Sequence, residues 1–246
     1  MDGVPIKAIL FDLDNTLIET NRANQYAMQK TYELLKTSLE LDDDVISQIC
    51  DRFKQKLLHE KFDPSAGRSI DEVRVGHWED SIKESVDSCS TPSLAAQCYY
   101  LWKKSRLELI RLSPEISSLL KQFRRKYKLL LLTNGNSQTQ KEKVEAAACE
   151  GFFDKIVVGG DYAEQKPHPS IFRLCFDLLQ VEAQDCIMVG DSLDTDIQGG
   201  FNAHVRATVW INSAGDAVPV GSVTPDYTLS TVLDLEDVLA QLNKRQ

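Results

Sequence analysis

Two aspartates near the start of the chain are spaced for chemistry. Asp12 and Asp14 lie two residues apart in FDLDNT, directly after an apolar run that predicts a buried strand. Alternate residues of an extended chain point to the same side, so the two carboxylates are expected to lie close together. Carboxylates held close repel each other unless a cation lies between them or one keeps a proton. Both conditions suit phosphoryl transfer, in which Asp12 attacks phosphorus and Asp14 exchanges protons with the leaving oxygen and with water. An acidic turn that caps a helix is the structural alternative.

Two later segments could complete such a site. In LLLLTNG a strand ends at Thr133 and Asn134, where a hydroxyl and backbone N–H groups could bind phosphate oxygens. An ordinary turn is the alternative, because Thr-Asn-Gly is also common in turns. In VGDSLDTD, Asp191 directly follows another strand. It could form an oxygen-rich Mg²⁺ site with Asp12 and the carbonyl oxygen of Asp14.

Two further charged residues lie close to these segments in the sequence. Lys166 lies in QKPHP, where two prolines keep the backbone extended, so its side chain could reach the site and neutralise both Asp12 and a phosphate. A solvated surface lysine is the plain alternative. Asp196, in the same segment as Asp191, is expected to order a metal-bound water rather than to bind the metal itself.

The elements that must position these residues follow from the hydrophobic pattern. Five runs that are apolar almost throughout predict parallel strands buried on both faces, at residues 6–11, 128–132, 156–158, 186–189 and 207–211. Amphipathic stretches between them predict helices at residues 114–126, 138–149, 169–179 and 194–203, and residues 227–242 predict an edge strand and a closing helix. This alternation predicts an α/β fold with a doubly wound parallel sheet. Ligands of such sheets bind at the carboxyl ends of the strands, where Asp12, Thr133 and Asp191 fall.

The interval between the first two strands is far longer than a βαβ connection needs. It shows no strand pattern and predicts four helices, at residues 22–39, 43–60, 70–86 and 92–109. We therefore expect a helical domain inserted after the first strand. The predicted division is residues 1–18 and 113–246 for an α/β catalytic core and residues 19–112 for a helical cap.

Composition narrows the class of partner. A net charge of −9 argues against nucleic acid or an anionic membrane as the main partner. The first apolar run is broken by Asp12 and Asp14, which is not typical of a signal peptide or a membrane span. The six cysteines include no CxxC pair, which favours reduced thiols in the cytoplasm. We expect a cytoplasmic protein with a small-molecule substrate, and no oligomeric state follows from the sequence.

Four segments, taken in order, resemble the motifs of the haloacid dehalogenase superfamily: FDLDNT, TNG, the lysine of QKPHP, and GDSLDTD. The inserted helices resemble the superfamily's cap of the first type. The resemblance implies a HAD-like, Rossmannoid core, Mg²⁺ as cofactor, and transfer of phosphate to Asp12 with Asp14 as acid and base. It also implies that the phosphate is held by the backbone at Leu13, Asp14 and Asn15 and by Thr133, Asn134 and Lys166.

Longer stretches, including VRVGHWEDSI and CYYLWKKSRLELI in the inserted segment, resemble sialic acid 9-phosphate phosphatases of this superfamily. This resemblance implies hydrolysis of N-acetylneuraminate 9-phosphate in sialic acid biosynthesis. That substrate carries a carboxylate far from its phosphate, and the planar fork of an arginine suits a carboxylate. Arg74 is the preferred candidate for this contact, with Arg106 and the nearby His77 as further specificity residues. A solvated helix arginine is the alternative for Arg74 and for Arg106.

Other activities use overlapping motifs. A dehalogenase needs neither a second aspartate nor a metal, so Asp14 and Asp191 argue against one. Another sugar-phosphate or phosphoglycolate-type phosphatase uses the same four motifs, and so does a sugar-phosphate mutase; both stay open. A binding module without catalysis would usually lack a nucleophile or a metal ligand, and this sequence keeps both.

Overall fold

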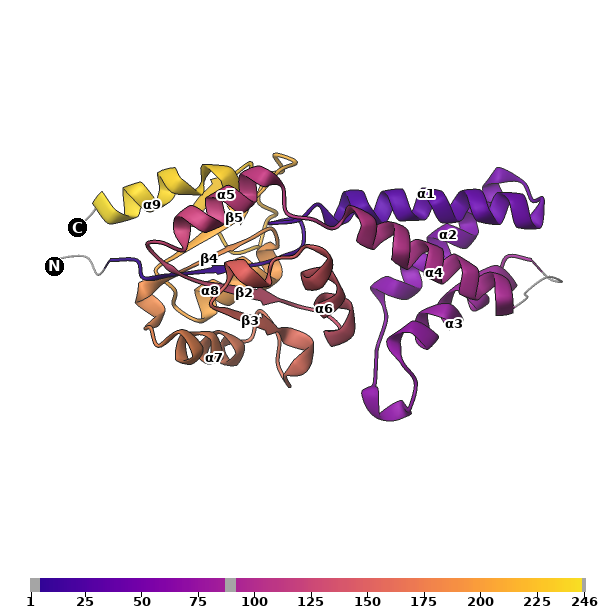
Figure 1. Ribbon diagram of the computed structural model, residues 1–246, viewed down its shortest axis with the longest axis horizontal. Helices are drawn as coiled ribbons and strands as arrows, with labels where there is room; N and C mark the ends of the chain where they lie inside the picture. The colour runs from indigo at the N-terminus through magenta and orange to yellow at the C-terminus, as the bar shows by residue number, and fades with distance from the viewer. Residues whose placement is uncertain (1–4, 87–91, 245–246) are drawn as a thin grey trace. The chain divides into compact units, whose positions relative to one another are not determined.

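The fold was taken from a computed structural model, which describes residues 5–86 and 92–244. The chain forms two compact units, one built from the two ends of the chain, up to Glu19 and from Arg111 onward, and the other from Thr20–Ile110. Figure 1 shows the first unit as a sheet flanked by helices and the second as helices alone. The chain passes between the units one residue after the first predicted boundary and two residues before the second.

The first unit is built on a six-stranded parallel sheet. Its strands are β1 (Ala8–Phe11), β2 (Lys128–Thr133), β3 (Lys155–Val158), β4 (Cys186–Gly190), β5 (Ala207–Ile211) and β6 (Tyr227–Leu229). They lie in the order β3-β2-β1-β4-β5-β6, so the chain winds outward from β1 first to one edge and then to the other. The predicted doubly wound α/β sheet is confirmed. The winding direction reverses between β1 and β4, and the crevice beyond their carboxyl ends is where such sheets bind ligands.

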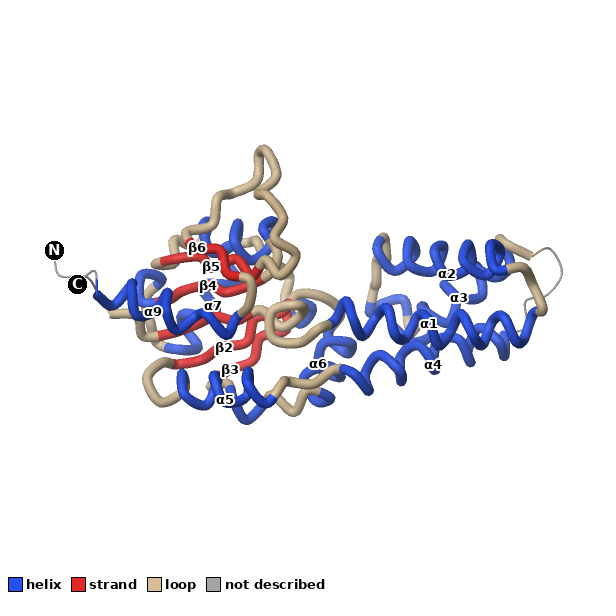
Figure 2. The backbone as a smooth tube through the Cα atoms, turned by 90° about the horizontal axis from the view of Figure 1, so that it is seen from above, coloured by secondary structure: helices blue, strands red, loops and turns tan. Residues whose placement is uncertain are grey.

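Helices cover both faces of this sheet. They are α5 (Pro114–Phe123), α6 (Ser137–Ala146), α7 (Pro169–Leu179), α8 (Gln198–Asn202) and α9 (Leu235–Lys244). Figure 1 shows α5 and α9 on one face and α7 on the other. Ala8 and Leu10 of β1 belong to the same buried cluster as Phe172 and Phe176 of α7, because alternate strand residues point to one face. Figure 2 shows the strands running side by side across this unit.

The second unit is a bundle of α1 (Thr20–Leu39), α2 (Asp43–Leu58), α3 (Ile70–Lys83) and α4 (Pro92–Leu109). The inserted helical cap is therefore present, and α3 ends three residues before the predicted end of its segment. Ser69 and Glu72 form a capping box that fixes the start of α3. Aromatic rings fill the interior: Phe53 stacks on Trp78 with their centroids 4.0 Å apart, and its edge meets Trp102 at 5.5 Å.

Within the part of the chain that the structure describes, no helix combines the length and the apolar character needed to cross a membrane. The five cysteines in that part are free thiols in the interior, and Cys89 lies outside the described residues.

Candidate active site

Strand pairing brings the first acidic residues together. β1 and β4 are neighbours with Phe11 opposite Val189, so Asp12 and Asp191 follow adjacent strand ends. The N–H of Asp12 donates to the carbonyl oxygen of Val189 at 2.9 Å, which continues the ladder up to the site. One carboxylate oxygen from each of Asp12, Asp191 and Asp196 lies within 4.8 Å of the others. Two of the three predicted metal-site residues therefore meet at the β1–β4 crevice through their carboxylates.

Asp196 reaches this cluster because of the turn after β4. Ser192 caps a π-helical turn at Leu193–Ile197, where the sequence predicts the start of an ordinary helix. The turn folds Asp196 back so that its Oδ2 accepts the N–H of Ser192 at 3.1 Å. A side chain at Gly190 would put its Cβ 2.2 Å from that carboxylate. Glycine is therefore required at this strand end for Asp196 to approach.

Lys166 lies at the centre of the cluster with only 1% of its side chain exposed. Its Nζ contacts Asp12 Oδ1 at 2.6 Å, Asp196 Oδ1 at 2.7 Å and the carbonyl oxygen of Leu132 at 2.7 Å. These three contacts occupy the three protons of an ammonium group. In this state Lys166 neutralises carboxylates.

Asn134 holds the backbone of Lys166 in place. Its Oδ1 accepts the N–H of Lys166 at 3.0 Å, and its Nδ2 donates to the carbonyl oxygen of the same residue at 2.8 Å. The peptide bond between Lys166 and Pro167 is cis. The side chain of Asn134, predicted to bind phosphate, is thus engaged in placing the lysine.

The electrostatics of the cluster favour a divalent cation. Burial raises the pKa of Asp12 to about 7 although Lys166 opposes the shift, and burial raises the pKa of Asp191 to about 6. Burial would lower the pKa of Lys166, but Asp12 and Asp196 outweigh it and raise that pKa. The raised pKa values of the carboxyl groups show that burial and the neighbouring acidic groups oppose their full ionisation. With all three ionised, the carboxylates carry −3 and the lysine +1, which leaves −2 for a bound cation to balance. An all-oxygen donor set with this surplus suits a hard cation such as Mg²⁺.

Asp14 points to a different partner from Asp12. Its Oδ1 and Oδ2 lie 2.7 and 2.6 Å from Nζ of Lys143, and its Oδ2 also accepts from Nε2 of Gln140 at 3.0 Å. Both partners come from α6 and are buried. The predicted metal contact of Asp14 uses its backbone carbonyl oxygen. The contacts described here involve only the side-chain oxygens, so they do not bear on that prediction.

Lys143 and Gln140 are not among the site residues predicted from the sequence. A signal was available, because Gln140, Lys143 and Val144 have the spacing of one helix face and are all buried. Two polar residues on the face that carries the apolar Val144 indicate a buried polar contact. Their partner could not be predicted from the sequence, because Asp14 lies more than 120 residues earlier in the chain.

The predicted phosphate-binding residues have different surroundings. The hydroxyl of Thr133 is buried and has no hydrogen-bond partner among the described residues, so it is placed to receive a ligand oxygen. Leu13 is fully buried, and its carbonyl oxygen accepts from Leu17 and Ile18 in the turn after β1. The N–H of Asn15, which the resemblance assigns to phosphate, instead donates to Ile18 in the same turn at 2.8 Å. The side chain of Asn15 donates to Asp191 Oδ2 at 3.3 Å.

The specificity candidates lie in the helical unit. Arg74 is 9% exposed, and its guanidinium binds the carboxylate of Glu60 through two nitrogens, with Nε to Oε2 at 3.0 Å and Nη2 to Oε1 at 2.8 Å. His77 Nε2 lies 3.3 Å from Oε2 of Glu60. Burial would raise the pKa of Glu60, but hydrogen bonds from His77 and Arg74 outweigh it and lower that pKa. The guanidinium of Arg106 lies over the ring of Trp102, 5.0 Å from its centroid.

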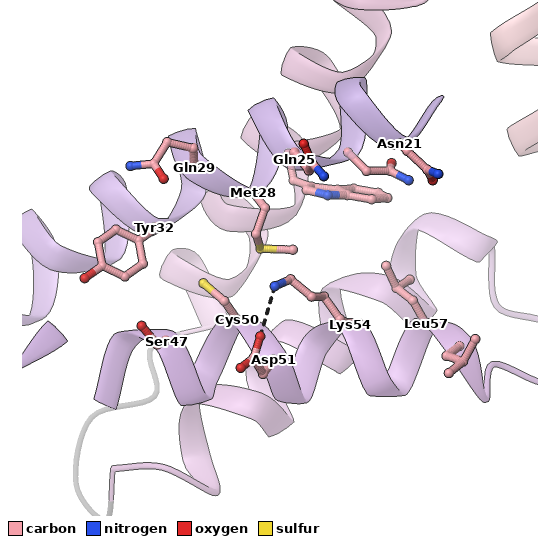
Figure 3. A pocket seen from close by; sticks show the side chains of 13 residues that line it. Asn21, Gln25, Met28, Gln29, Tyr32, Ser47, Cys50, Asp51, Lys54 and Leu57 are labelled. Atoms are coloured by element: carbon pink, nitrogen blue, oxygen red, sulfur yellow. Dashed lines mark hydrogen bonds and ion pairs between the residues drawn. The ribbon is translucent and has the colours of Figure 1, made fainter. Parts of the chain in front are cut away.

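The same unit contains a groove of about 930 Å³ between α1 and α2 (Figure 3). Polar side chains such as Asn21, Gln25 and Lys54 line it together with the apolar Met28 and Leu57. In Figure 3 the side chain of Lys54 turns along α2 to pair with Asp51. A groove with this mixed lining can accommodate a polyhydroxylated molecule as well as an apolar one.

Comparisons with known proteins agree with the fold and the motifs. The family model for haloacid dehalogenase-like hydrolases matches residues 6–204. The chain is 45% identical to N-acylneuraminate-9-phosphatase of Rattus norvegicus and 44% identical to that of Homo sapiens, in each case over 97% of this chain and 95% of the relative. The 2-haloacid dehalogenase of Pseudomonas syringae has the same fold, with a TM-score of 0.67 and 24% identity over 96% of this chain and 99% of that one.

These matches confirm the resemblance that the four motifs carry, and they extend it through the inserted helices. With its doubly wound sheet, its acidic residues at the β1–β4 crevice and its helical insertion after β1, the chain belongs to the family of haloacid dehalogenase-like hydrolases.

Proposed function

We propose that this protein is a Mg²⁺-dependent phosphatase of small phosphomonoesters that works through a phosphoaspartate on Asp12. The observation that carries the proposal is the meeting of Asp12, Asp191 and Asp196 around the single cation Lys166 at the β1–β4 crevice. With all three carboxylates ionised, this cluster has a surplus of two negative charges. A phosphate dianion can enter such a site only with a cation beside it. The unpartnered hydroxyl of Thr133 adds a neutral donor at the same sheet edge.

In the first step an oxygen of Asp12 attacks phosphorus, and the bond from phosphorus to the ester oxygen breaks. Asp14 gives a proton to the leaving oxygen and becomes the carboxylate that its contact with Lys143 stabilises. In the second step the carboxylate of Asp14 takes a proton from water, and that water attacks phosphorus. Inorganic phosphate leaves and Asp12 is restored.

Asp12, Asp191 and the carbonyl oxygen of Asp14 would hold the Mg²⁺, with Asp196 in the outer shell. When bound, the ion supplies charge that stabilises the transferring phosphoryl group. Lys166 neutralises Asp12 and Asp196, so that the nucleophile is accessible to an anion. Asn134 fixes the backbone of Lys166 and thereby the direction of its side chain.

The proposed substrate is an N-acylneuraminate 9-phosphate, as the names of the rat and human relatives indicate. The similarity to these relatives covers 97% of the chain, so it includes the inserted helices, which contain none of the four motifs. This supports the proposed substrate. The carboxylate of that substrate requires a cation, and Arg74 already binds the carboxylate of Glu60 with both arms of its fork. We propose that the substrate carboxylate takes over part of this contact, with His77 and Arg106 as further specificity residues.

The test is a panel of phosphomonoesters assayed for released phosphate with Mg²⁺, with chelator, and with Ca²⁺. We expect fastest release from N-acetylneuraminate 9-phosphate, loss of release in chelator, and recovery with Mg²⁺. Ca²⁺ should inhibit, because its larger shell would let Asp12 bind through both oxygens. Full turnover in chelator would refute the metal assignment. Preference for glycolate or another sugar phosphate, or release of an isomeric sugar phosphate in place of inorganic phosphate, would refute the substrate.

A further inference from the structure

Helix α6 presents two buried polar side chains to one carboxylate. Lys143 and Gln140 are 4% and 5% exposed, and they lie three residues apart on one face. Nζ of Lys143 contacts both carboxylate oxygens of Asp14, at 2.7 and 2.6 Å, and Nε2 of Gln140 donates to Oδ2 at 3.0 Å. Asp14 is therefore held at two points by one rigid helix.

The same glutamine also ties Asp14 to the turn after β2. Nε2 of Gln140 donates to the carbonyl oxygen of Asn134 as well as to Asp14. Gly135 follows with φ +111°, and an added Cβ there would lie 3.1 Å from Nε2 of Gln140. The turn therefore leaves space for this amide group, which connects Asp14 to the end of β2, where Thr133 lies.

A packing role alone does not explain this choice of residues. Removing an ammonium group from water carries a desolvation penalty of several kcal/mol, and an apolar side chain would pack at the same place without it. The penalty is offset here by an ion pair to one specific carboxylate. Such a pair holds a group that must transfer a proton in a fixed direction, and misplacement of reacting groups slows catalysis steeply.

We propose that Lys143 and Gln140 are positioning residues that hold the carboxyl group of Asp14 in line with the leaving oxygen. This inference rests on the proposed function, in which Asp14 protonates that oxygen as the bond to phosphorus breaks. If these contacts with Asp14 are lost, kcat/KM should fall for substrates whose leaving group needs a proton. It should change little for substrates whose leaving anion is stable.

The experiment measures kcat/KM of Lys143→Met on a series of substituted phenyl phosphates, because kcat/KM includes loss of the leaving group and excludes hydrolysis of the phosphoenzyme. The substrates are similar in size, so other contacts are matched. We expect a fall of about 10-fold or more with phenyl phosphate, part of the roughly 10²–10⁴-fold that a general acid contributes, because Asp14 itself is kept. With p-nitrophenyl phosphate, whose leaving anion is far more stable, the fall should be less than about 3-fold. Gln140→Leu should show the same trend more weakly, and it serves if Lys143→Met folds poorly.

Two controls separate positioning from a general effect. Lys141→Met removes an exposed lysine of the same helix, paired with Asp161, and should leave the whole series unchanged. In an Asp14→Asn background, Lys143→Met should cause no further selective loss, because its effect passes through Asp14. Equal losses across the series, or an undiminished selective loss in the Asp14→Asn background, would overturn the inference. No release of phosphate from N-acetylneuraminate 9-phosphate or from any aryl phosphate by the unaltered protein would instead overturn the proposed function, and this inference with it.

Discussion

The two units of the molecule bury charge in different ways. In the α/β unit, Asp12, Asp191 and Asp196 outnumber their one central cation, Lys166. In the helical unit the buried Arg74 is paired with Glu60, and the partly buried Lys103 is paired with Asp71. The first arrangement is incomplete without a ligand and the second is complete by itself.

This contrast assigns the reaction to the α/β unit and selection among substrates to the helical unit. An unbalanced cluster of pKa-shifted carboxylates is typical of a catalytic site. A balanced ion pair contributes to specificity only when a ligand charge competes for one of its members. Variants of the nucleophile, of the cap interior, of its buried arginine and of its surface should therefore differ in the size and selectivity of their effects.

The largest effect is expected from Asp12→Asn. The substitution keeps the shape of the side chain but removes the attacking oxygen, so kcat should fall roughly 10³-fold or more, about 4 kcal/mol. The loss should be similar for every phosphomonoester, since the step concerns phosphate alone. The measurement is phosphate release from a sugar phosphate and an aryl phosphate, with circular dichroism to verify folding. Activity within about tenfold of the parent would exclude the phosphoaspartate.

The next effect concerns the cap interior. Phe53 is fully buried between Trp78 and Trp102, so Phe53→Ala should lower the free energy of unfolding by about 3–5 kcal/mol. Denaturant unfolding measures it, and Tyr100→Ala is the matched control because that ring is 54% exposed. We expect the control to change stability by less than about 1 kcal/mol. Equal effects of the two variants would contradict the aromatic core of the bundle.

A smaller and selective effect is expected from Arg74→Met. It should lower kcat/KM for N-acetylneuraminate 9-phosphate by about 1.5–3 kcal/mol, the range of a charge-assisted hydrogen bond, and leave a small aryl phosphate little changed. Arg106→Met is measured beside it. Because Arg74→Met leaves Glu60 as an uncompensated buried charge, the double variant with Glu60→Gln separates loss of the contact from damage to the cap. Equal losses on both substrates would indicate damage, and no loss in either arginine variant would exclude the carboxylate contact.

The smallest effect is expected at the groove of Figure 3. Lys54 and Asp51 form an ion pair at 2.9 Å, but their side chains are 54% and 70% exposed. Lys54→Met should therefore change stability by less than about 1 kcal/mol at any ionic strength. Thermal unfolding at low and high salt measures it. A larger, salt-dependent loss would show that the cap depends on surface charge as well as on its aromatic interior.

The sheet was readable from the sequence because its strands are continuous apolar runs. Residues 207–211 and 169–179 match β5 and α7 to the residue, and the other ends of strands and core helices differ by at most three residues, except at the start of α8. There the π-helical turn replaces the first helical residues, because Ser192 and the returning Asp196 set the local hydrogen bonds. Such a turn depends on Gly190 accepting a carboxylate beside it, which no periodicity reveals.

The candidate site was readable in its residue types but not in its pairings. The meeting of Asp12 and Asp191 follows from strand order, which parallel α/β rules constrain. Strand order does not predict the contact of Asp14 with Lys143 or that of Arg74 with Glu60. Each joins two side chains whose orientation is determined by tertiary packing. Asn134 illustrates the limit: its place beside Lys166 was expected, but the use of its amide to hold the backbone was not.

The central position of β1 also has a consequence in time. β1 precedes the other five strands of the sheet in the chain, yet its neighbours begin only at Lys128 and Cys186. At about 5–20 residues per second, the nascent chain waits roughly 6–25 s for β2 and longer for β4. During that interval the bundle, all of whose helices precede β2 in the chain, can fold while the apolar strand that precedes Asp12 has no partner. The strand that leads to the proposed nucleophile is thus an unpaired apolar segment that we expect cotranslational chaperones to shield.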